Sequence, residues 1–470
     1  MNTNKIIYIA AISSLLMGFT SCEDEDGNPY PDGNGAVSVS KVFLLDASDT
    51  TGHKEREVEF ARLGQTLRLE GSGFGGTTKV LVNGYETYFN TALTTDNSMI
   101  FSLSGTTPVA GADESVRNKI QFVKSSGTYS YDFVIRAASP KITSISPSIP
   151  KPGETVKVSG VNLEEVSEVT LPGGISVTEN IVNAPEDESG EWFTFVMPEG
   201  VTENGTITIT GANGQAISGA YFNDTHGMLL NFDGNGDHGF WSWSETGSMI
   251  NDEDLVDDPL GIYGKVCQII PQRLIDADGQ IAGGKSRATE VWTAGDGNEK
   301  YRTLDWVAEN WTDGISTPLS EVGFQFDIYV PEEWNLTGQI EIVLGNNYNF
   351  SGYGSDELKS KSAMVYAYVP WLNSDGTTTA FKTDGWQTVT IPLSEFSKYK
   401  FEIEDKNTPL FSEFVEDHAA LKYPNIGMGF VNTDVKISDD LVYKADVCKQ
   451  LIYVDNFRFV NIKSTTVSDF

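Results

Sequence analysis

The sequence predicts an all-β protein in which two small sandwiches precede one large sandwich or jelly roll. A segment near residue 64 repeats near residue 153, short stretches alternate apolar and polar residues, and all nine tryptophans follow position 190. The alternation has the period of strands that bury one face. Aromatic rings either fill cores or present a face to a ligand, so we expect function in the tryptophan-rich second half.

The N-terminus has the pattern of a secretory signal. Lys5 precedes an apolar run from Ile6 to Leu16, and small residues then lead to Cys22. This run is shorter than the about 20 apolar residues that a transmembrane helix needs. The segment resembles a bacterial lipoprotein signal, although Phe19 stands where that family usually has Leu. The resemblance implies that residues 1–21 are removed and that Cys22 is lipidated.

An acidic linker follows the cysteine. Residues 23–26 are all Glu or Asp, which resembles the surface-export signal of Gram-negative glycan-degrading bacteria; an ordinary solvated tether is the alternative. The range 22–40 is rich in Gly, Asn, Asp and Pro and has few apolar residues, so we expect a flexible linker. It would hold the folded part just off the membrane.

Residues 41–138 and 139–226 are predicted to be two homologous sandwiches. Residues 64–74 match residues 153–163 position by position, with strand alternation followed by glycines that permit tight turns. The second copy, which opens with the proline-framed segment 140–147, resembles the immunoglobulin-like (Ig-like) IPT/TIG family. The first copy lacks that opening, and its assignment depends on the internal match. Neither copy shows a catalytic-looking cluster, so we interpret both as spacers.

Residues 227–463 are predicted to form one large jelly-roll or β-sandwich domain. Alternating apolar residues indicate half-buried strands over 322–328, 340–344 and 426–430. A single helical turn is expected within residues 393–401. Two further stretches resemble strands of carbohydrate-binding jelly rolls, namely residues 385–393 and 453–459.

The charge narrows the class of ligand. The chain has 66 acidic and 32 basic residues, a net charge of −34, which disfavours nucleic acid, anionic lipid head groups and polyanionic glycans. A neutral ligand fits best, although solubility of an exposed protein would also explain the acidity. Cys267 and Cys448 are too few for a disulfide scaffold or a zinc site. They form either a single bridge or two buried thiols.

A sugar-binding site needs flat aromatic rings with amide, carboxylate or arginine side chains beside them. Trp334 and Trp371 follow prolines in predicted loops, and we expect both rings to be exposed there for glycan binding. Trp386 begins an alternating strand and is assigned to the core. Core packing is an equal alternative for the remaining glycan-binding candidates, which are Trp306, Trp311, Tyr353 and Tyr368.

The sequence predicts no metal site, cofactor or catalytic residue. The segment 233–237 places oxygen ligands at alternate positions, but His238 and Ser244 depart from the EF-hand pattern. A turn is the better interpretation, and a structural calcium that also uses Asp455 is the alternative. A glycoside hydrolase needs two carboxylates about 5 to 9.5 Å apart, and the acidic segment 402–405 lacks the order of acids found in jelly-roll glycanases.

Taken together, the signal, the tandem Ig-like domains and the aromatic C-terminal domain resemble the surface glycan-binding proteins of polysaccharide-utilisation systems. The most similar type ends in a xyloglucan-binding domain. The resemblance implies a non-catalytic lipoprotein of the cell outer membrane that captures a neutral plant cell-wall polysaccharide and passes it to a neighbouring transporter. The alternatives are a surface adhesin that binds protein through its Ig-like domains and, less favoured, a glycoside hydrolase.

Overall fold

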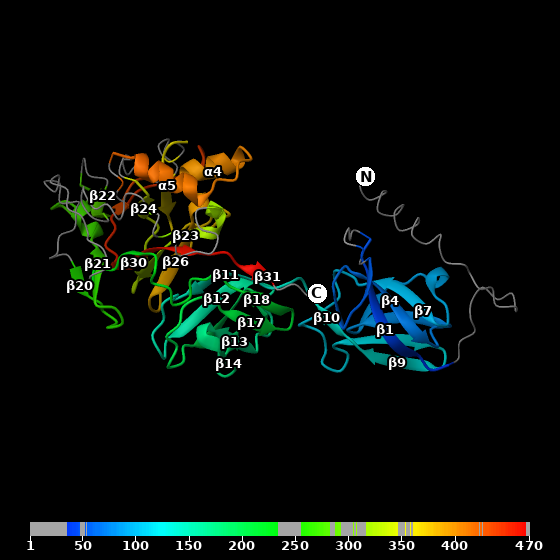
Figure 1. Ribbon diagram of the computed structural model, residues 1–470. Helices are drawn as coiled ribbons and strands as arrows, with labels where there is room; N and C mark the ends of the chain where they lie inside the picture. The colour runs from blue at the N-terminus through cyan, green and yellow to red at the C-terminus, as the bar shows by residue number, and fades with distance from the viewer. Residues whose placement is uncertain are drawn as a thin grey trace. The chain divides into compact units, whose positions relative to one another are not determined.

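The computed structural model describes residues 35–47, 52, 54–233, 255–282, 287–292, 304, 307, 316–345, 353, 358, 361–422, 424 and 426–466. In this part the protein is nearly all β, which confirms the predicted fold class (Figure 1). None of its described helices is long and apolar enough to cross a membrane. The chain divides into two compact units, Met1–Pro140 with Gly211–Gly214, and Lys141–Thr210 with Gln215–Phe470.

The first sandwich lies in the N-terminal unit and has two four-stranded antiparallel sheets and a short parallel pair. Leu67 and Leu69, the alternating residues of the repeat, point into its core with Val80 and Phe122. The strand orders are β2(Glu55–Glu57)-β1(Ser38–Leu45)-β4(Thr66–Ser72)-β7(Ser98–Ser102), β6(Tyr85–Thr87)-β5(Thr77–Val82)-β8(Lys119–Lys124)-β9(Gly127–Asp132) and β3(Phe60–Arg62)-β10(Val134–Arg136).

The second sandwich opens the C-terminal unit and repeats this pattern. Val156, Val158 and Val169 occupy its core at the positions that match Leu67, Leu69 and Val80. The strand orders are β11(Lys141–Ser146)-β12(Thr155–Val161)-β16(Trp192–Val196)-β15(Val182–Asn183) and β14(Ile175–Val177)-β13(Glu168–Leu171)-β17(Thr208–Gly211)-β18(Gly214–Ile217)-β31(Thr465–Thr466).

Glycine at one repeated position has a steric cause in both sandwiches. A Cβ atom on Gly71 would lie 1.9 Å from the carbonyl oxygen of Ser38, and one on Gly160 would lie 2.0 Å from that of Lys141. Only glycine allows β4 to approach β1, and β12 to approach β11, this closely. The match between Gly71 and Gly160 in the sequence therefore reflects the same local packing.

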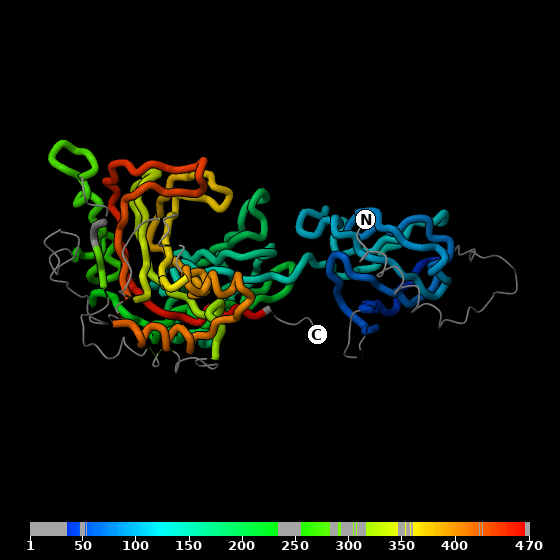
Figure 2. The backbone as a smooth tube through the Cα atoms, turned by 90° about the horizontal axis from the view of Figure 1, so that it is seen from above, coloured from blue at the N-terminus to red at the C-terminus, as the bar shows by residue number. Residues whose placement is uncertain are grey.

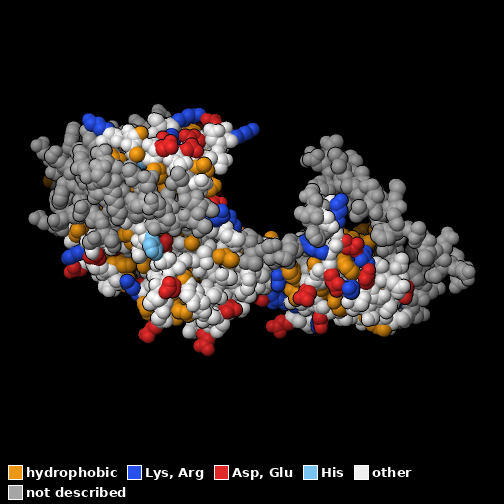
Figure 3. All heavy atoms as spheres, viewed as in Figure 1, with side chains coloured by type: hydrophobic (Ala, Val, Ile, Leu, Met, Phe, Trp, Pro, Cys, Tyr) orange, Lys and Arg blue, Asp and Glu red, His pale blue; other side chains and the backbone are white. Residues whose placement is uncertain are grey.

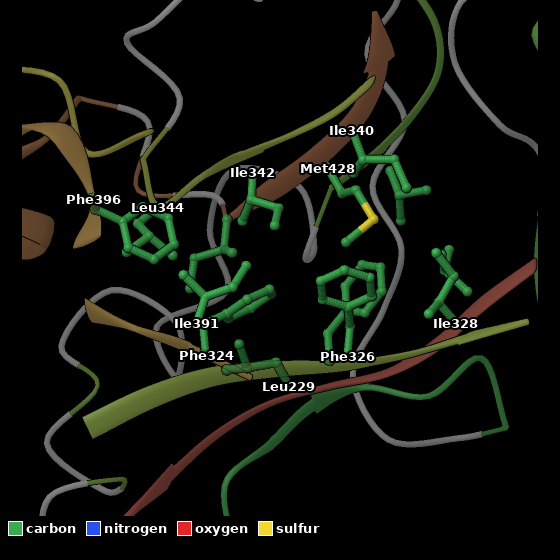
Figure 4. Packing of buried hydrophobic residues seen from close by; sticks show 14 of the residues in the cluster. Leu229, Phe324, Phe326, Ile328, Ile340, Ile342, Leu344, Ile391, Phe396 and Met428 are labelled. Atoms are coloured by element: carbon green, nitrogen blue, oxygen red, sulfur yellow. The ribbon is translucent and has the colours of Figure 1, made fainter. Parts of the chain in front are cut away.

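The C-terminal sandwich packs a six-stranded sheet on a four-stranded sheet. Phe324 and Phe326 point from the larger sheet toward Ile342 and Met428 on the smaller one (Figure 4). The strand orders are β20(Leu255–Asp257)-β21(Lys265–Ile269)-β30(Ile452–Asn461)-β23(Val322–Tyr329)-β26(Gln387–Pro392), with β19(Met228–Leu230) also on β30, then β22(Arg287–Trp292)-β27(Gly427–Val431)-β24(Gln339–Val343)-β25(Val365–Tyr368), and the pair β28(Val435–Lys436)-β29(Val442–Tyr443).

Two short helices lie together at one edge of this sandwich (Figure 1). The expected helical turn is present as the 3-10 turn Leu393–Glu395 followed by α4(Ser397–Glu404). The helix α5(Phe411–Ala420) was not expected, although its buried residues recur with helical spacing. These residues are Phe411, Phe414, Val415 and His418.

The strands β23, β24 and β27 are buried on both faces, so the expectation that they are half-buried is wrong. For β23 the cause is the second sandwich, which covers part of the outer face of the larger sheet. Ser148 in the second sandwich donates its backbone N–H to the Thr388 hydroxyl of β26 at 2.9 Å. A sequence period cannot reveal a partner that covers the second face.

A buried ion pair lies where the second sandwich meets the C-terminal sandwich. Arg458 and Asp327 are both fully buried, with a guanidinium nitrogen 3.3 Å from a carboxylate oxygen. Arg458 also donates to the Ser148 hydroxyl at 2.6 Å and to the side-chain oxygen of Gln325 at 3.1 Å. The Thr388 hydroxyl donates to Asp327 at 2.6 Å. The second sandwich therefore shares a buried polar network with the C-terminal domain.

A β-bulge in β30 shapes this network. Asn456 and Phe457 together oppose the single residue Phe326 of β23, and Asn456 has a positive φ of 54°. The Asn456 side chain donates to Asp327 at 2.8 Å, and its carbonyl oxygen accepts from Arg458 at 2.6 Å. The extra residue turns the strand. It places Arg458 on the face of the larger sheet that turns away from the core.

The end of the described chain crosses between the same two sandwiches. After β30 the segment runs to the second sandwich, shown in red in Figure 2. There β31 pairs antiparallel with β18, with Thr466 opposite Ala216 and Thr465 opposite Ile217. Val460 of β30 belongs to the core of the second sandwich. The C-terminal unit is thus closed by pairing between segments that lie far apart in the sequence.

We predict that Arg458→Met lowers the free energy of unfolding of the C-terminal unit by about 3–5 kcal/mol, because it leaves the Asp327 carboxylate buried without its charge partner. Denaturant or thermal unfolding measures the loss. The double variant Arg458→Met with Asp327→Leu removes both charges and should recover most of it. A single variant within about 1 kcal/mol of the wild type would contradict this role.

Asp455 leads to a prediction about pH. Burial, followed by the Asp327 charge, raises the pKa of this carboxyl well above its ordinary value of 3.8. Between these two pKa values the folded state holds a proton that the unfolded state releases, so stability falls as pH rises. Asp455→Asn should therefore melt at a higher temperature than the wild type at pH 7, with a smaller difference at pH 4.

The exposed position Asp384 gives the control for this pH effect, since Asp384→Asn removes one negative charge from the surface. Thermal unfolding of both variants at the two pH values separates them. An Asp455→Asn variant that melts below the wild type at pH 7 would show that the carboxylate is ionised and needed.

Candidate functional site

The smaller sheet of the C-terminal sandwich has two chemically different faces. Its core face carries Ile340, Ile342, Met428 and Phe430, which pack toward the larger sheet. The opposite face carries Glu290, Trp292, Gln339, Glu341 and Gly427, which we call the outer face. Gln339, Glu341 and Glu290 are all buried there. Buried polar side chains on the face that turns away from a core need specific partners and mark this face as the candidate site.

Trp292 lies on the outer face, with its ring 3% exposed in the described structure. It pairs with Gly427 across β22 and β27, and a Cβ atom on Gly427 would lie 2.3 Å from the indole. The ring therefore lies against the glycine backbone. Trp292 and Val343 belong to a small apolar cluster on this side of the sheet.

The amide and carboxylates next to the ring are placed by the strands. Gln339 accepts the backbone N–H of Tyr353 at 2.8 Å and donates to the Thr433 hydroxyl at 3.1 Å. Glu341 lies on the central strand between the small residues Gly429 and Ala367. An indole face, an amide and carboxylates are the groups that bind the C–H face and the hydroxyls of a sugar.

Trp334 and Trp371 do not present a face to solvent, and the expectation that they do is wrong. Both side chains are 0% exposed. The Trp334 indole donates to the Thr337 carbonyl at 2.7 Å, and the Trp371 indole donates to the Gly338 carbonyl at 2.8 Å. Each ring therefore fills the core. The indole N–H of each ring is satisfied by a backbone carbonyl of the turn at residues 337–338.

The tyrosine candidates also lie mainly toward the core. Tyr366 and Tyr368 share a face, as expected from alternation, but it is the core face. Tyr368 is half-buried and packs edge-on against Phe326, with ring centroids 5.7 Å apart, and burial raises the pKa of its hydroxyl. Tyr353 is half-buried, and its backbone contacts Gln339 of the outer face.

Two candidates lie outside the described residues, namely Trp306 and Trp311. They belong to the segment between β22 and β23, and they remain predictions. Trp386 is buried, and its indole donates to Asp258 at 3.0 Å. It is buried as expected, but against Tyr263 and Tyr329 and not among the residues between the two sheets.

Sequence reasoning missed the polar side chains of the outer face. Gln339 and Glu341 alternate with Ile340 and Ile342, and the usual interpretation of such alternation is that the polar residues face solvent. A signal was present, because Gln339 and Glu341 are long polar side chains in a short strand, and the later stretch that becomes its neighbour β27 contains two glycines. Only the fold shows that these side chains are buried.

The structure bears on the pairing of the two cysteines and on the calcium alternative at Asp233. Cys267 and Cys448 are both buried and form no disulfide, and burial raises the pKa of Cys448 to about 12. Asp233 accepts backbone N–H groups from Gly264 and Lys265, at 3.1 and 2.9 Å, whereas Asp237 lies outside the described residues. Within the described part, no group of three His, Cys, Asp or Glu side chains is arranged to hold a metal.

The acidic segment 402–405 is not a strand. It ends α4, and three of its four residues are exposed. Its resemblance to the acidic strand of jelly-roll glycanases is therefore superficial.

We predict that Trp334→Ala and Trp371→Ala act through stability, each lowering the free energy of unfolding by about 3–5 kcal/mol, as large-to-small changes in a core do. Thermal unfolding measures this effect. Tyr88→Ala, at a side chain that is 83% exposed in the first sandwich, is the control and should leave the unfolding temperature nearly unchanged. A stable Trp334→Ala variant that loses only ligand binding would restore the original expectation.

Comparison with known proteins identifies the C-terminal domain. The family model for the surface glycan-binding protein B xyloglucan binding domain matches residues 222–461. An IPT/TIG domain-containing protein of Bacteroides ovatus is 24% identical over 264 residues, which are 56% of this chain and 45% of that protein. This chain thus matches less than half the length of that relative.

The structure is similar to the crystal structure of the surface glycan-binding protein PbSGBP-B from Prevotella bryantii. The TM-score is 0.59 at 20% sequence identity, and the match covers 91% of this chain and 99% of that chain. At this identity the similarity supports the fold. Because the family model matches more than half of the chain, the protein belongs to the surface glycan-binding protein B family through a domain that spans residues 222–461.

Proposed function

We propose that this protein binds a neutral plant cell-wall polysaccharide of the xyloglucan type at the cell surface and does not cleave it. The observation that carries the proposal is the match of residues 222–461 to the family of xyloglucan-binding domains. The outer face lies within that range. Its combination of a flat ring, an amide and carboxylates suits a polyhydroxylated ligand.

The charge of the molecule supports a neutral glycan over an acidic one. The net charge is −34, and acidic side chains are spread over the face of the molecule seen in Figure 3. Glu290 and Glu341 add carboxylates at the outer face itself. A sulfated or uronic-acid polysaccharide would be repelled there.

Trp306 and Trp311 are the further rings that we assign to the glycan. They lie in the segment between β22, which carries Trp292 and Glu290, and β23. Sugar rings would stack on these indoles while their hydroxyls bond to amide and carboxylate groups. This division of roles is part of the proposal.

Surface capture requires attachment outside the cell. The lipoprotein-like signal and Cys22 support an outer-membrane lipid anchor, and the acidic residues 23–26 support export to the surface. In this arrangement the protein holds the polysaccharide near a neighbouring transporter. An adhesin that binds another protein through its Ig-like domains is the alternative function, and it would leave the C-terminal domain without glycan affinity.

The test is calorimetric titration of the mature protein with xyloglucan, mixed-linkage glucan, mannan, xylan and starch, with a reducing-end assay on the same samples. We predict saturable binding of xyloglucan or a related β-linked glycan without new reducing ends. Trp306→Ala and Trp311→Ala should each weaken binding by about 2 kcal/mol or more, as expected of aromatic hot spots. Trp192→Ala, at a half-buried ring of the second sandwich, is the matched control.

Three outcomes would count against this proposal. Absence of binding to every glycan would favour the adhesin. New reducing ends would favour a hydrolase, for which Glu290 and Glu341 would be the first carboxylates to test. Unchanged affinity in both Trp306→Ala and Trp311→Ala would place the binding rings elsewhere.

A further inference from the structure

The larger sheet of the C-terminal sandwich carries aromatic side chains that the outer face does not use. Tyr453 pairs with Gln268 on one neighbouring strand and with Tyr329 on the other. Trp386 directly precedes β26, beside Tyr329. These four residues follow one another across four adjacent strands, and we call Gln268, Tyr453, Tyr329 and Trp386 the ring row.

The ring row faces away from the core. Ile328 and Val454, the neighbours of Tyr329 and Tyr453 along the chain, are fully buried in the core, so alternation directs both tyrosines outward. The Tyr329 and Tyr453 rings are stacked, with centroids 5.9 Å apart and planes at 21°. The Trp386 ring is 5.9 Å from Tyr329 at 47°. The two half-buried tyrosine rings therefore lie side by side on this surface, and the buried Trp386 ring packs beside Tyr329.

Contacts with Asp258 and Tyr263 fix the Trp386 ring at one end of the row. The Trp386 indole donates to Asp258 at 3.0 Å, and the Tyr263 ring lies 5.0 Å from Trp386. The Tyr263 hydroxyl donates to Asp327 at 3.2 Å. Asp258 also accepts the backbone N–H groups of its own loop. A site whose rings are fixed before binding loses little side-chain entropy when a ligand arrives.

The other end of the row offers polar groups to a ligand. Tyr329, Tyr453 and Gln268 are half-buried. In the part of the chain that the structure describes, their hydroxyl and amide groups make no hydrogen bond, and none of these atoms is buried. Flat rings with polar atoms at their edges match a sugar, whereas an apolar protein segment would leave those atoms unpaired.

The surroundings of the row are acidic. Glu154 of the second sandwich lies near Asp327 and Asp258, and burial together with these charges raises its pKa. Asp455 lies one row away on the same face, opposite Asp327. Phosphate or sulfate groups would be repelled here, which leaves an uncharged sugar as the matching ligand.

We propose that the ring row is a second contact site for a neutral sugar chain, in which pyranose rings stack on Tyr453 and Tyr329 and a hydroxyl bonds to Gln268. The inference rests on the proposed function, since it assigns the same class of ligand to a second place on the domain. The two sites lie on opposite sheets of one sandwich. A long polysaccharide that reaches both gains affinity from effective concentration, which a short oligosaccharide lacks.

The test compares xyloglucan polymer with a short xyloglucan oligosaccharide by calorimetry. Tyr453→Ala should weaken polymer binding about three- to tenfold, since a stacked aromatic contact contributes about 0.5–1.5 kcal/mol. The affinity of the primary site for the oligosaccharide should stay within about twofold. Tyr453→Phe keeps the ring and should retain polymer binding, while Gln268→Ala should weaken it at least twofold with all rings in place.

A matched control exists in the first sandwich, where Tyr131 stacks on Phe133 at 6.3 Å and the same 21° angle. Tyr131→Ala should leave polymer binding unchanged. If the wild type binds xyloglucan but folded Tyr453→Ala and Gln268→Ala bind polymer equally well, the ring row is overturned and the proposed function stands. Equal losses in Tyr131→Ala or Tyr453→Phe would also overturn it. A wild type that binds no glycan would overturn both proposals.

Discussion

The fully buried ion pair between Arg458 and Asp327 is the constraint on which the C-terminal unit depends. Removing two charges from water costs several kcal/mol per ion, and their attraction offsets this only with good geometry and satisfied hydrogen bonds. Ser148, Thr388 and Asn456 supply those bonds. Because Ser148 belongs to the second sandwich and the others to the C-terminal domain, the network is complete only when the two are packed together.

This packing assigns different roles to the two sheets of the C-terminal sandwich. The larger sheet gives part of its outer surface to the second sandwich and keeps the ring row at the margin. The smaller sheet has no strand of the second sandwich paired to it, and its outer face carries Trp292, Gln339 and Glu341. Ligand chemistry therefore concentrates on surfaces that the interface between sandwiches does not consume.

The tryptophans show why composition alone does not locate a glycan site. Trp334 and Trp371 occur in polar, proline-marked loops, yet both rings lie in the core because Thr337 and Gly338 provide carbonyl acceptors for their indole N–H groups. A satisfied N–H removes the main cost of burying an indole. Trp292 lies on the outer face through its position in β22, and its ring is also only 3% exposed. The loop or strand origin of a ring did not predict its exposure.

The sequence by itself determined the all-β class, the repeated sandwich, the strand at residues 322–328 and the burial of Trp386, because these depend on local period and on steric needs such as those at Gly71 and Gly160. Only the tertiary structure decided that β23 is buried on both faces, that Trp334 fills the core and that buried polar groups line the outer face. The physical reason is distance along the chain: Arg458 donates to Ser148 across 310 residues, and no local pattern records which distant segment covers a face.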